Sequence, residues 1–374
     1  SDVHALTGRY PAIVGLALME EPMERSKSDR ENAQLMGAEI AKIDAIGGIA
    51  AISAHWDNPM PGPNGANDFS QVNLRRLLPG GDLNGTLNRW LDTVALMAQQ
   101  AVRADGSRIP FIFRPLHEGN GSWAWWYYER GGADAYKELF RYIVKYLRDH
   151  GTAGQMLVAF APNGNFNGEA RRYQLLYPGD DVVDILGYDG YDTNVAKLAK
   201  EGWVQETVTD LAMLVRLAEA RGKVAALTEF GRNGAKMIKA RGNVDTEFYT
   251  DLLRAILADP SARKIAYLMT WANWGDNEVY VPKPGEELAE NFKAFVRQLQ
   301  LTRVVDRDIS VDVAIEPGTT DANDLSLDRS QLTIRRGENR ARFTVAAVAD
   351  GQSEGDESYT VKILNPQGAV LSTG

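Results

Sequence analysis

Residues 111–123 read FIFRPLHEGNGSW, an apolar run from Phe111 that passes into a glycine-rich polar segment ending at Trp123. Apolar side chains at helical spacing follow, namely Tyr136, Leu139, Phe140, Ile143 and Leu147. A second apolar run then covers residues 156–161. Continuous apolar runs are typical of parallel strands that are covered on both faces. This stretch therefore predicts a strand–helix–strand unit.

The same alternation extends in both directions along the chain. The apolar runs are Ala12–Met19, Gly48–Ala54, Phe111–Leu116, Met156–Ala161, Val182–Tyr188, Val224–Thr228 and Ile265–Trp271. Between them lie amphipathic segments, the first of which opens with a capping box from Ser28 to Glu31. Such alternation predicts a parallel α/β domain, either a (β/α)8 TIM barrel or an open doubly wound sheet. Seven runs are one fewer than a (β/α)8 barrel needs, so either one strand escapes notice or the first strand is missing before Ser1.

The composition changes near Leu301. From Thr302 onward there is no Trp, and the only aromatic residues are Phe343 and Tyr359. Apolar and polar residues alternate at 309–315, 331–334, 342–348 and 358–364, with turn-rich stretches between these runs. That pattern predicts an antiparallel β-sandwich. We therefore expect a barrel domain over residues 1–300 and a small β-sandwich domain over residues 304–374.

Composition and charge exclude several classes of protein. The 374 residues are 44% hydrophobic and 24% charged, as in ordinary globular proteins. The net charge of −9 argues against nucleic acid as the main partner, because phosphate binding needs a basic face. The absence of cysteine excludes disulfides, thiolate catalysis and Cys-ligated zinc. No apolar run approaches the roughly 20 residues that cross a bilayer, so no membrane span is expected.

Two glutamates at the ends of different predicted strands form the candidate catalytic pair. Glu118 follows the apolar run at 111–116, and Glu229 follows the run at 224–228. In parallel barrels the carboxyl ends of the strands meet on one face, where ligands bind. Glycoside hydrolysis needs one carboxylic acid to protonate the leaving oxygen and a second carboxylate at the anomeric carbon. The pattern therefore favours a glycoside hydrolase.

Tryptophans gather at the same predicted strand ends. Six of the eight lie there, namely Trp56, Trp123, Trp125, Trp126, Trp271 and Trp274. Because aromatic faces stack on sugar rings, we expect these six to face a ligand, and Trp90, at helical spacing, to fill the core. Arg114, Leu116 and Glu118 share one strand face by period two. His117 falls on the other face unless the backbone has already turned.

These motifs resemble glycoside hydrolase family 26, whose best-known members are β-mannanases. The resemblance rests on Arg114-Pro-Leu-His-Glu118 with Asn120-Gly-Ser-Trp123, on Thr228-Glu229-Phe-Gly231, and on Asp184 with Asp189-Gly-Tyr191. It extends from about Thr7 to Leu299. It implies a (β/α)8 barrel that cleaves glycosides by a retaining double displacement, with no cofactor for catalysis and no metal in the barrel.

The resemblance also implies roles for single residues. Glu118 would be the acid/base and Glu229 the nucleophile. The substrate-binding residues would be His55, Trp56, Arg114, His117, Trp123, Asp189, Tyr191 and Trp271. The expected activity is endo-β-1,4-mannanase on a polysaccharide or oligosaccharide, in a secreted or periplasmic protein. A β-1,3-xylanase or mixed-linkage β-glucanase is the alternative within the fold, and a non-catalytic carbohydrate-binding or adhesion protein is the alternative of another class.

The tail from Asp308 to Gly374 resembles a Calx-β domain that lacks about one strand at each end. The match covers residues 350–357 and 359–368. Such domains often bind calcium through loop carboxylates, and the candidate ligands here are Asp350, Glu354, Asp356 and Glu357. A solvated acidic turn is the alternative reading of these four residues. The sequence indicates no oligomeric state.

Overall fold

The computed structural model describes residues 2–18, 22–24, 26–60, 72–193, 197–234, 237–274, 278–301, 308–317, 325–335, 341, 343–348 and 359–367. By its contacts the chain divides into two compact units, Ser1–Lys293 and Ala294–Gly374. The division falls within helix α8 (Ala289–Leu301).

The first unit is built around one sheet of seven parallel strands that are hydrogen-bonded in chain order. They are β1 (Ile13–Ala17), β2 (Ile49–Ser53), β3 (Phe111–Arg114), β4 (Met156–Phe160), β5 (Ile185–Asp192), β6 (Val224–Arg232) and β7 (Leu268–Thr270). Each of the seven predicted runs therefore contains a strand. β5 and β6 extend beyond the predicted apolar runs, because residues 189–192 pair with residues 229–232 although both stretches contain charged residues.

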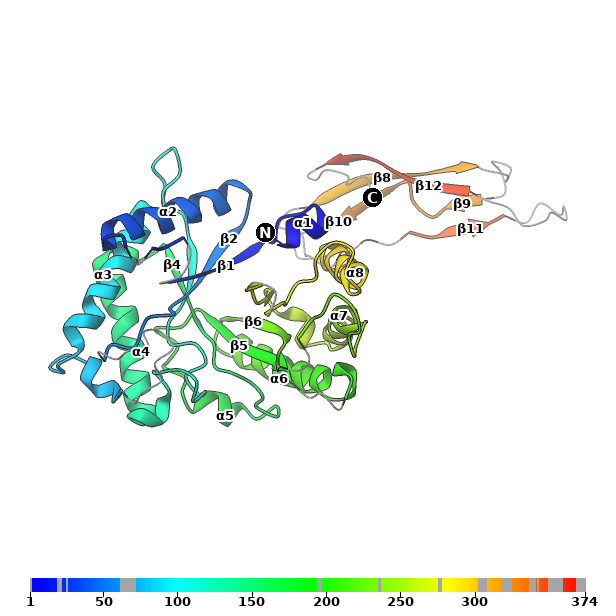
Figure 1. Ribbon diagram of the computed structural model, residues 1–374. Helices are drawn as coiled ribbons and strands as arrows, with labels where there is room; N and C mark the ends of the chain where they lie inside the picture. Colours follow the sequence, from blue (N-terminus) through cyan, green and yellow to red (C-terminus); the bar gives the residue numbers. More distant parts are fainter. Residues whose placement is uncertain are drawn as a thin grey trace. The chain divides into compact units, whose positions relative to one another are not determined.

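Helices cover the strands on the outside (Figure 1). The long ones are α2 (Asp29–Ala45), α3 (Asn84–Gln100), α4 (Ala133–Leu147), α6 (Trp203–Glu219) and α7 (Phe248–Ala258), and the short ones are α1 (Asp2–Thr7) and α5 (Ala170–Gln174). Single 3-10 turns occur at Leu74–Leu77, Tyr128–Arg130, Ala199–Glu201 and Ala262–Lys264, and a π turn occurs at Arg148–Thr152. The predicted capping box begins α2: Ser28 Oγ accepts the Glu31 N–H, and the Glu31 carboxylate accepts the Ser28 N–H at 2.9 Å. Across the described ranges, no helix has the length and apolarity that crossing a bilayer requires.

Side chains from all seven strands meet in one apolar layer inside the ring of strands. The layer consists of Ala51, Ile112, Ala159, Ile185, Ala226 and Met269, with Ile13 and Tyr267 packed against it. β1 and β7 come together there, since a Cβ atom placed on Gly15 would lie 3.5 Å from the sulfur of Met269. The sheet is therefore a nearly closed α/β barrel, as predicted, and the open doubly wound alternative is wrong. Within a strand, residues two positions further along face the carboxyl end of this interior.

The second unit contains, among its described residues, two small antiparallel sheets. Strand β8 (Ile309–Pro317) pairs with both β10 (Gln331–Ile334) and β12 (Tyr359–Gln367), and β9 (Leu325–Leu327) pairs with β11 (Val345–Ala347). The antiparallel all-β character agrees with the alternating pattern of the sequence. The four calcium candidates, Asp350, Glu354, Asp356 and Glu357, lie outside the described residues.

Candidate active site

A cleft with a volume of about 650 Å³ lies at the carboxyl ends of the barrel strands. Parallel barrels bind ligands at this end because the strand ends and the loops after them gather side chains from distant parts of the sequence. Seven of the predicted site residues line the cleft, namely His55, His117, Glu118, Trp123, Tyr191, Glu229 and Trp271. The two candidate catalytic glutamates are therefore in one solvent-accessible cavity.

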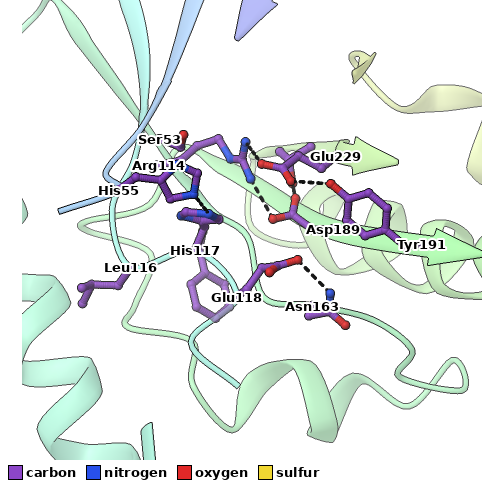
Figure 2. A network of polar contacts seen from close by, with 12 residues as sticks. Ser53, His55, Arg114, Leu116, His117, Glu118, Asn163, Asp189, Tyr191 and Glu229 are labelled. Carbon is purple, nitrogen blue, oxygen red and sulfur yellow. Dashed lines mark hydrogen bonds and ion pairs between the residues drawn. The ribbon is translucent and has the colours of Figure 1, made fainter. Parts of the chain in front are cut away.

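The chain turns sharply after β3, and the turn sets the direction of the side chains that follow. Leu116 and Glu118 have φ values of 50° and 52°, a left-handed conformation that costs a residue with a side chain roughly 1–3 kcal/mol. Leu116 points away from the polar cluster, whereas His117 and Glu118 point toward it (Figure 2). The expectation that Leu116 and Glu118 continue the strand face of Arg114 is wrong, because β3 ends at Arg114.

Arg114 joins two carboxylates beneath the cleft (Figure 2). Its Nη1 lies 2.7 Å from Glu229 Oε1, and its Nη2 donates to Asp189 Oδ2 at 2.7 Å. Asp189 Oδ1 also accepts a hydrogen bond from Thr228 Oγ1 at 2.6 Å. Although burial opposes it, the charges of Asp189 and Glu229 raise the pKa of Arg114, which remains a cation. Burial raises the pKa of Asp189.

Glu229 is held from two sides near the end of β6. Arg114 contacts Oε1, and the Tyr191 hydroxyl donates to Oε2 at 2.7 Å. Burial and the charge of Glu229 raise the pKa of Tyr191 well above its usual value, so the hydroxyl remains a donor. Both oxygens of Glu229 thus face positive charge or a donor, which stabilises the ionised form that a carboxylate nucleophile needs.

Glu118 has a different environment. Its Oε1 accepts from Asn163 Nδ2 at 2.8 Å and its Oε2 accepts from Trp123 Nε1 at 2.6 Å. Burial and the nearby charge of Glu229 raise the pKa of Glu118, while the hydrogen bonds from Asn163 and Trp123 oppose the rise. A carboxyl group with a raised pKa keeps its proton closer to neutral pH, which suits a general acid.

The separation of the carboxyl groups distinguishes two reaction types. One oxygen each of Glu118, Asp189 and Glu229 lies within 4.8 Å of the others. Retaining glycosidases place the two carboxyls about 5–5.5 Å apart, whereas inverting ones leave about 6.5–9.5 Å for a water molecule. The spacing here matches retention. Three carboxylates so close together could also ligate a metal ion, but Arg114 already supplies positive charge to two of them.

Two histidines meet at the edge of the cleft. His55 Nε2 and His117 Nε2 are 2.9 Å apart, so one ring donates and the other accepts. Burial lowers the pKa of His117 well below its usual value, and His55 and Arg114 add to the effect. Trp271 packs edge-on against His55, with ring centroids 5.7 Å apart. The pair presents polar imidazoles beside an aromatic face, a combination that suits a sugar.

Three predicted ligand contacts are corrected by the structure. Trp56, Arg114 and Asp189 are buried and are not among the residues that line the cleft, so none offers a surface to a ligand there. Trp56 stacks on Trp90 of α3, with ring centroids 5.6 Å apart, whereas the neighbouring His55 lines the cleft. The buried Arg114 side chain contacts both Asp189 and Glu229, so these two residues affect the cleft through Glu229.

Trp125 and Trp126 also differ from expectation. Both are buried, and their indole N–H groups donate to the backbone carbonyls of Trp56 and His117 at 2.8 and 2.7 Å. They therefore support the two loops that carry the histidines and do not face the cleft. Trp274 is 43% exposed but is not part of the cleft wall.

The sequence pattern misses other residues of the cleft wall, among them Asn163, Trp203 and Tyr280. Asn163 follows the end of β4, so the strand-end criterion that singled out the glutamates could have found it. Trp203 begins helix α6, and Tyr280 lies between β7 and α8. Neither Trp203 nor Tyr280 directly follows a predicted strand, so the strand-end criterion does not find them.

Known proteins resemble this chain over most of its length. The family described as glycosyl hydrolase family 26 matches residues 1–262. A mannan endo-1,4-β-mannosidase from Bifidobacterium adolescentis is 44% identical over 306 residues, which is 79% of this chain and 30% of that protein. The chain thus spans less than a third of the length of that curated relative.

Solved structures share the fold. The catalytic domain of an endo-β-1,4-mannanase from Bacillus sp. JAMB-750 is 37% identical, with a TM-score of 0.74 over 79% of each chain. A modular endo-β-1,4-mannanase from Cellulomonas fimi is 32% identical, with a TM-score of 0.74 over 93% of this chain and 89% of that one.

Proposed function

The chain belongs to glycosyl hydrolase family 26, and from this membership we propose that it is a retaining endo-β-1,4-mannanase. The observation that carries the proposal is the arrangement of Glu118 and Glu229, whose oxygens lie within 4.8 Å in one cleft. Their surroundings differ in the way the reaction requires. Arg114 and Tyr191 stabilise negative charge on Glu229, while burial raises the pKa of Glu118.

The reaction is a double displacement. A Glu229 oxygen attacks the anomeric carbon, the bond to the leaving oxygen breaks, and Glu118 gives that oxygen its proton. Glu118, now a carboxylate, takes a proton from water, whose oxygen attacks the anomeric carbon and releases Glu229 from the ester. Both glutamates return to their starting states. Side chains and water supply every proton and electron pair, so catalysis requires no cofactor.

The cleft residues divide between the two sugars that flank the scissile bond. His55, His117, Tyr191 and Trp271 line the same cleft as Glu229 and bind the sugar that becomes attached to it. Trp123, which is 50% exposed and contacts Glu118, stacks on the departing sugar. Arg114 and Asp189 act through Glu229, because their side chains are buried.

Activity on β-1,4-mannan and two substitutions test this proposal. Glu229→Ala is expected to lower kcat by roughly 10⁴-fold or more while mannopentaose still binds in calorimetry. Glu118→Ala with an activated aryl mannoside and azide is expected to yield the β-glycosyl azide, because azide attacks the glycosyl-enzyme on the retained face. Near wild-type turnover by Glu229→Ala, or an α-azide product, contradicts the assignment.

Parallel assays on other polymers separate the alternatives. Release of sugars from β-1,3-xylan or lichenan, with none from mannan, assigns the related xylanase or glucanase activity. Binding of mannan without any hydrolysis supports the carbohydrate-binding or adhesion protein. The proposal places the chain in a secreted or periplasmic protein, because a mannan polymer is too large to enter a cell, and fractionation of the producing cells checks this location.

We propose that the second unit is part of a Calx-β-like domain. The antiparallel pairing of β8 with β12 supports this assignment, since β12 covers residues 359–367 of the stretch that resembles such domains. Calcium binding through Asp350, Glu354, Asp356 and Glu357 belongs to the same proposal. Calorimetric titration of the full chain with CaCl₂, compared with a variant carrying Ala at all four positions, tests it; the same heat from both proteins contradicts it.

A further inference from the structure

Two side chains donate hydrogen bonds to the Glu118 carboxyl group, and they differ in how strongly their own contacts fix them. Trp123 is 50% exposed and donates to Oε2 from the edge of the cleft. Asn163 donates to Oε1 and is partly buried, and its backbone is fixed by a second side chain. Because an exposed aromatic ring is more easily displaced than a clamped amide, the two oxygens of Glu118 are not equivalent.

Asn120 is the side chain that fixes Asn163. Its Oδ1 accepts the Asn163 N–H at 2.8 Å, and its Nδ2 donates to the Asn163 carbonyl at 2.7 Å. The two bonds engage both backbone groups of Asn163 at once, so they fix the orientation of this residue as well as its position. The Asn163 side-chain amide then reaches Glu118 Oε1, 45 residues away along the chain.

The turn that carries Asn120 is itself tightly built. A Cβ atom on Gly119 would lie 2.2 Å from the Tyr136 ring, and one on Gly121 would lie 2.3 Å from the Trp123 ring. Glycine is therefore needed at position 119, because the buried Tyr136 ring approaches the backbone there, whereas the exposed Trp123 ring beside Gly121 has room to move. The Gly121 N–H also donates to the Glu118 carbonyl at 2.7 Å. Asn120 thus lies in a short turn directly after Glu118, and the Tyr136 ring and the hydrogen bond from Gly121 to Glu118 hold this turn in place.

We propose that Asn120 is a positioning residue for the acid/base: through Asn163 it keeps an N–H donor on Oε1 of Glu118, so that the catalytic proton is carried by Oε2. The inference rests on the proposed function, in which Glu118 is the acid. An oxygen that accepts from a fixed amide cannot also carry a proton directed at that amide. Oε2 becomes free when Trp123 leaves it for a sugar.

Other charged and titratable groups also act on Glu118, and the substitution of Asn120 leaves them in place. They come from several elements of the barrel, namely Arg114 of β3, Asp189 and Tyr191 of β5, Glu229 of β6 and Tyr280 after β7. His117 is the adjacent residue. A change in the pKa of Glu118 in an Asn120 variant is therefore attributable to the donor at Oε1.

A double-mutant cycle tests the proposal in the full chain. Asn163→Ala removes the donor to Oε1 and is expected to move the alkaline limb of the kcat/KM profile upward by about one pH unit, because a hydrogen bond to a charged group is lost. Asn120→Ala is expected to move the limb in the same direction. The double variant is expected to shift no further than Asn163→Ala alone, because Asn120 acts through Asn163. Trp123→Phe is the matched control, because it removes the donor to the other oxygen, Oε2. Its shift of the alkaline limb should add to the shift caused by Asn120→Ala, since the two act on different oxygens.

Carbon-13 NMR titration of the Glu118 carboxyl, assigned with Glu118→Gln, reports the same pKa without a substrate. If the wild-type chain degrades none of the polymers, the proposed function fails, while the titration still decides whether Asn120 is coupled to Glu118. The inference is overturned if Asn120→Ala lowers thermal stability but leaves the pKa of Glu118 unchanged. It is also overturned if the pKa shift caused by Asn120→Ala adds fully to the shift caused by Asn163→Ala. Should Asn120→Ala fail to fold, Asn120→Ser replaces it in the same cycle, with the same two outcomes decisive.

Discussion

The Arg114 guanidinium lies 2.7 Å from the Glu229 carboxylate, and these two side chains are only 1% and 4% exposed. The same guanidinium binds Asp189, so one cation balances two buried carboxylates. Charges removed from water are costly unless they are paired. The network therefore contributes to folding and also stabilises the ionised form of Glu229, the proposed nucleophile.

Replacement of Arg114 by Met is expected to lower the free energy of unfolding by about 3–5 kcal/mol, because both carboxylates lose their buried partner. Arg114→Lys keeps the charge but cannot contact both carboxylates in the same geometry, so it should lose less stability and still lose most activity. Urea unfolding and kcat/KM measure the two effects. Arg141→Met breaks the exposed pair with Asp181 and serves as the control, with an expected loss under about 1 kcal/mol. Equal losses at both arginines would contradict the proposed importance of the buried pair.

Tyr191→Phe removes the donor to Glu229 Oε2 and keeps the ring. We expect kcat/KM to fall about 10- to 100-fold, the equivalent of one hydrogen bond to a charged group, with little change in melting temperature. Tyr142→Phe, which removes a hydroxyl that donates to Asn88 at 2.7 Å outside the cleft, is the control and should retain normal kinetics. A Tyr191→Phe enzyme with unchanged kcat/KM would remove Tyr191 from the mechanism.

Sequence pattern predicts the strands of the barrel well because buried parallel strands are apolar along their length. It does not predict where β5 and β6 end, since residues 189–192 and 229–232, which include charged side chains, continue the ladder. Their pairing depends on neighbouring strands and not on their own hydrophobicity. Asp189, Tyr191 and Glu229 of the candidate site thus lie beyond the apolar runs from which the strands are predicted.

The tryptophans show a second limit of sequence pattern. Trp56 and Trp123 both follow a predicted strand, yet one is 3% exposed and the other is 50% exposed. The difference depends on how the backbone leaves the strand, as the positive φ angles of Leu116 and Glu118 illustrate. Likewise, the contact between Asn163 and Glu118 depends on loop geometry that no local pattern encodes.

The neutral state of His117 predicts a pH-dependent stability. Its pKa is lowered in the folded chain from an ordinary value of 6.5, so the unfolded chain binds a proton first as pH falls. Stability is therefore fully present above about pH 6.5 and declines below it, by up to about 1.4 kcal/mol per pH unit, until the folded pKa is reached. His117→Gln, which does not titrate, should flatten this decline in urea unfolding between pH 7 and pH 5. An unchanged slope would show that His117 is not responsible.

Asp210 of α6 anchors the loop that carries Asn163. Its carboxylate accepts the N–H groups of Phe166 and Gly168, each at 2.7 Å. Asp210→Ala leaves two backbone donors without this partner and is expected to cost about 1–3 kcal/mol of unfolding free energy. Hydrogen exchange at residues 163–168 should accelerate at the same time. The control is Glu206→Gln, because Glu206 is an exposed residue on the same helix and contacts the same loop through Asn165. Exchange that is no faster in Asp210→Ala than in this control would show that the loop is held by other contacts.

Glu118→Gln should make the protein more stable at neutral pH while it removes the acid. Burial and Glu229 raise the pKa of Glu118 in the folded chain above the ordinary value of 4.5, so the native state holds its proton longer than the unfolded state does. The stability that protonated Glu118 contributes is complete below pH 4.5 and is lost as pH rises through the folded pKa. Glutamine does not titrate, so the variant escapes this loss. We expect its advantage in unfolding free energy over the wild type to be larger at pH 8 than at pH 4, and kcat on mannan to fall sharply at both. An advantage that does not change with pH would mean that Glu118 has the same proton affinity in the folded and unfolded chains, and its assignment as the acid would then lose its electrostatic basis.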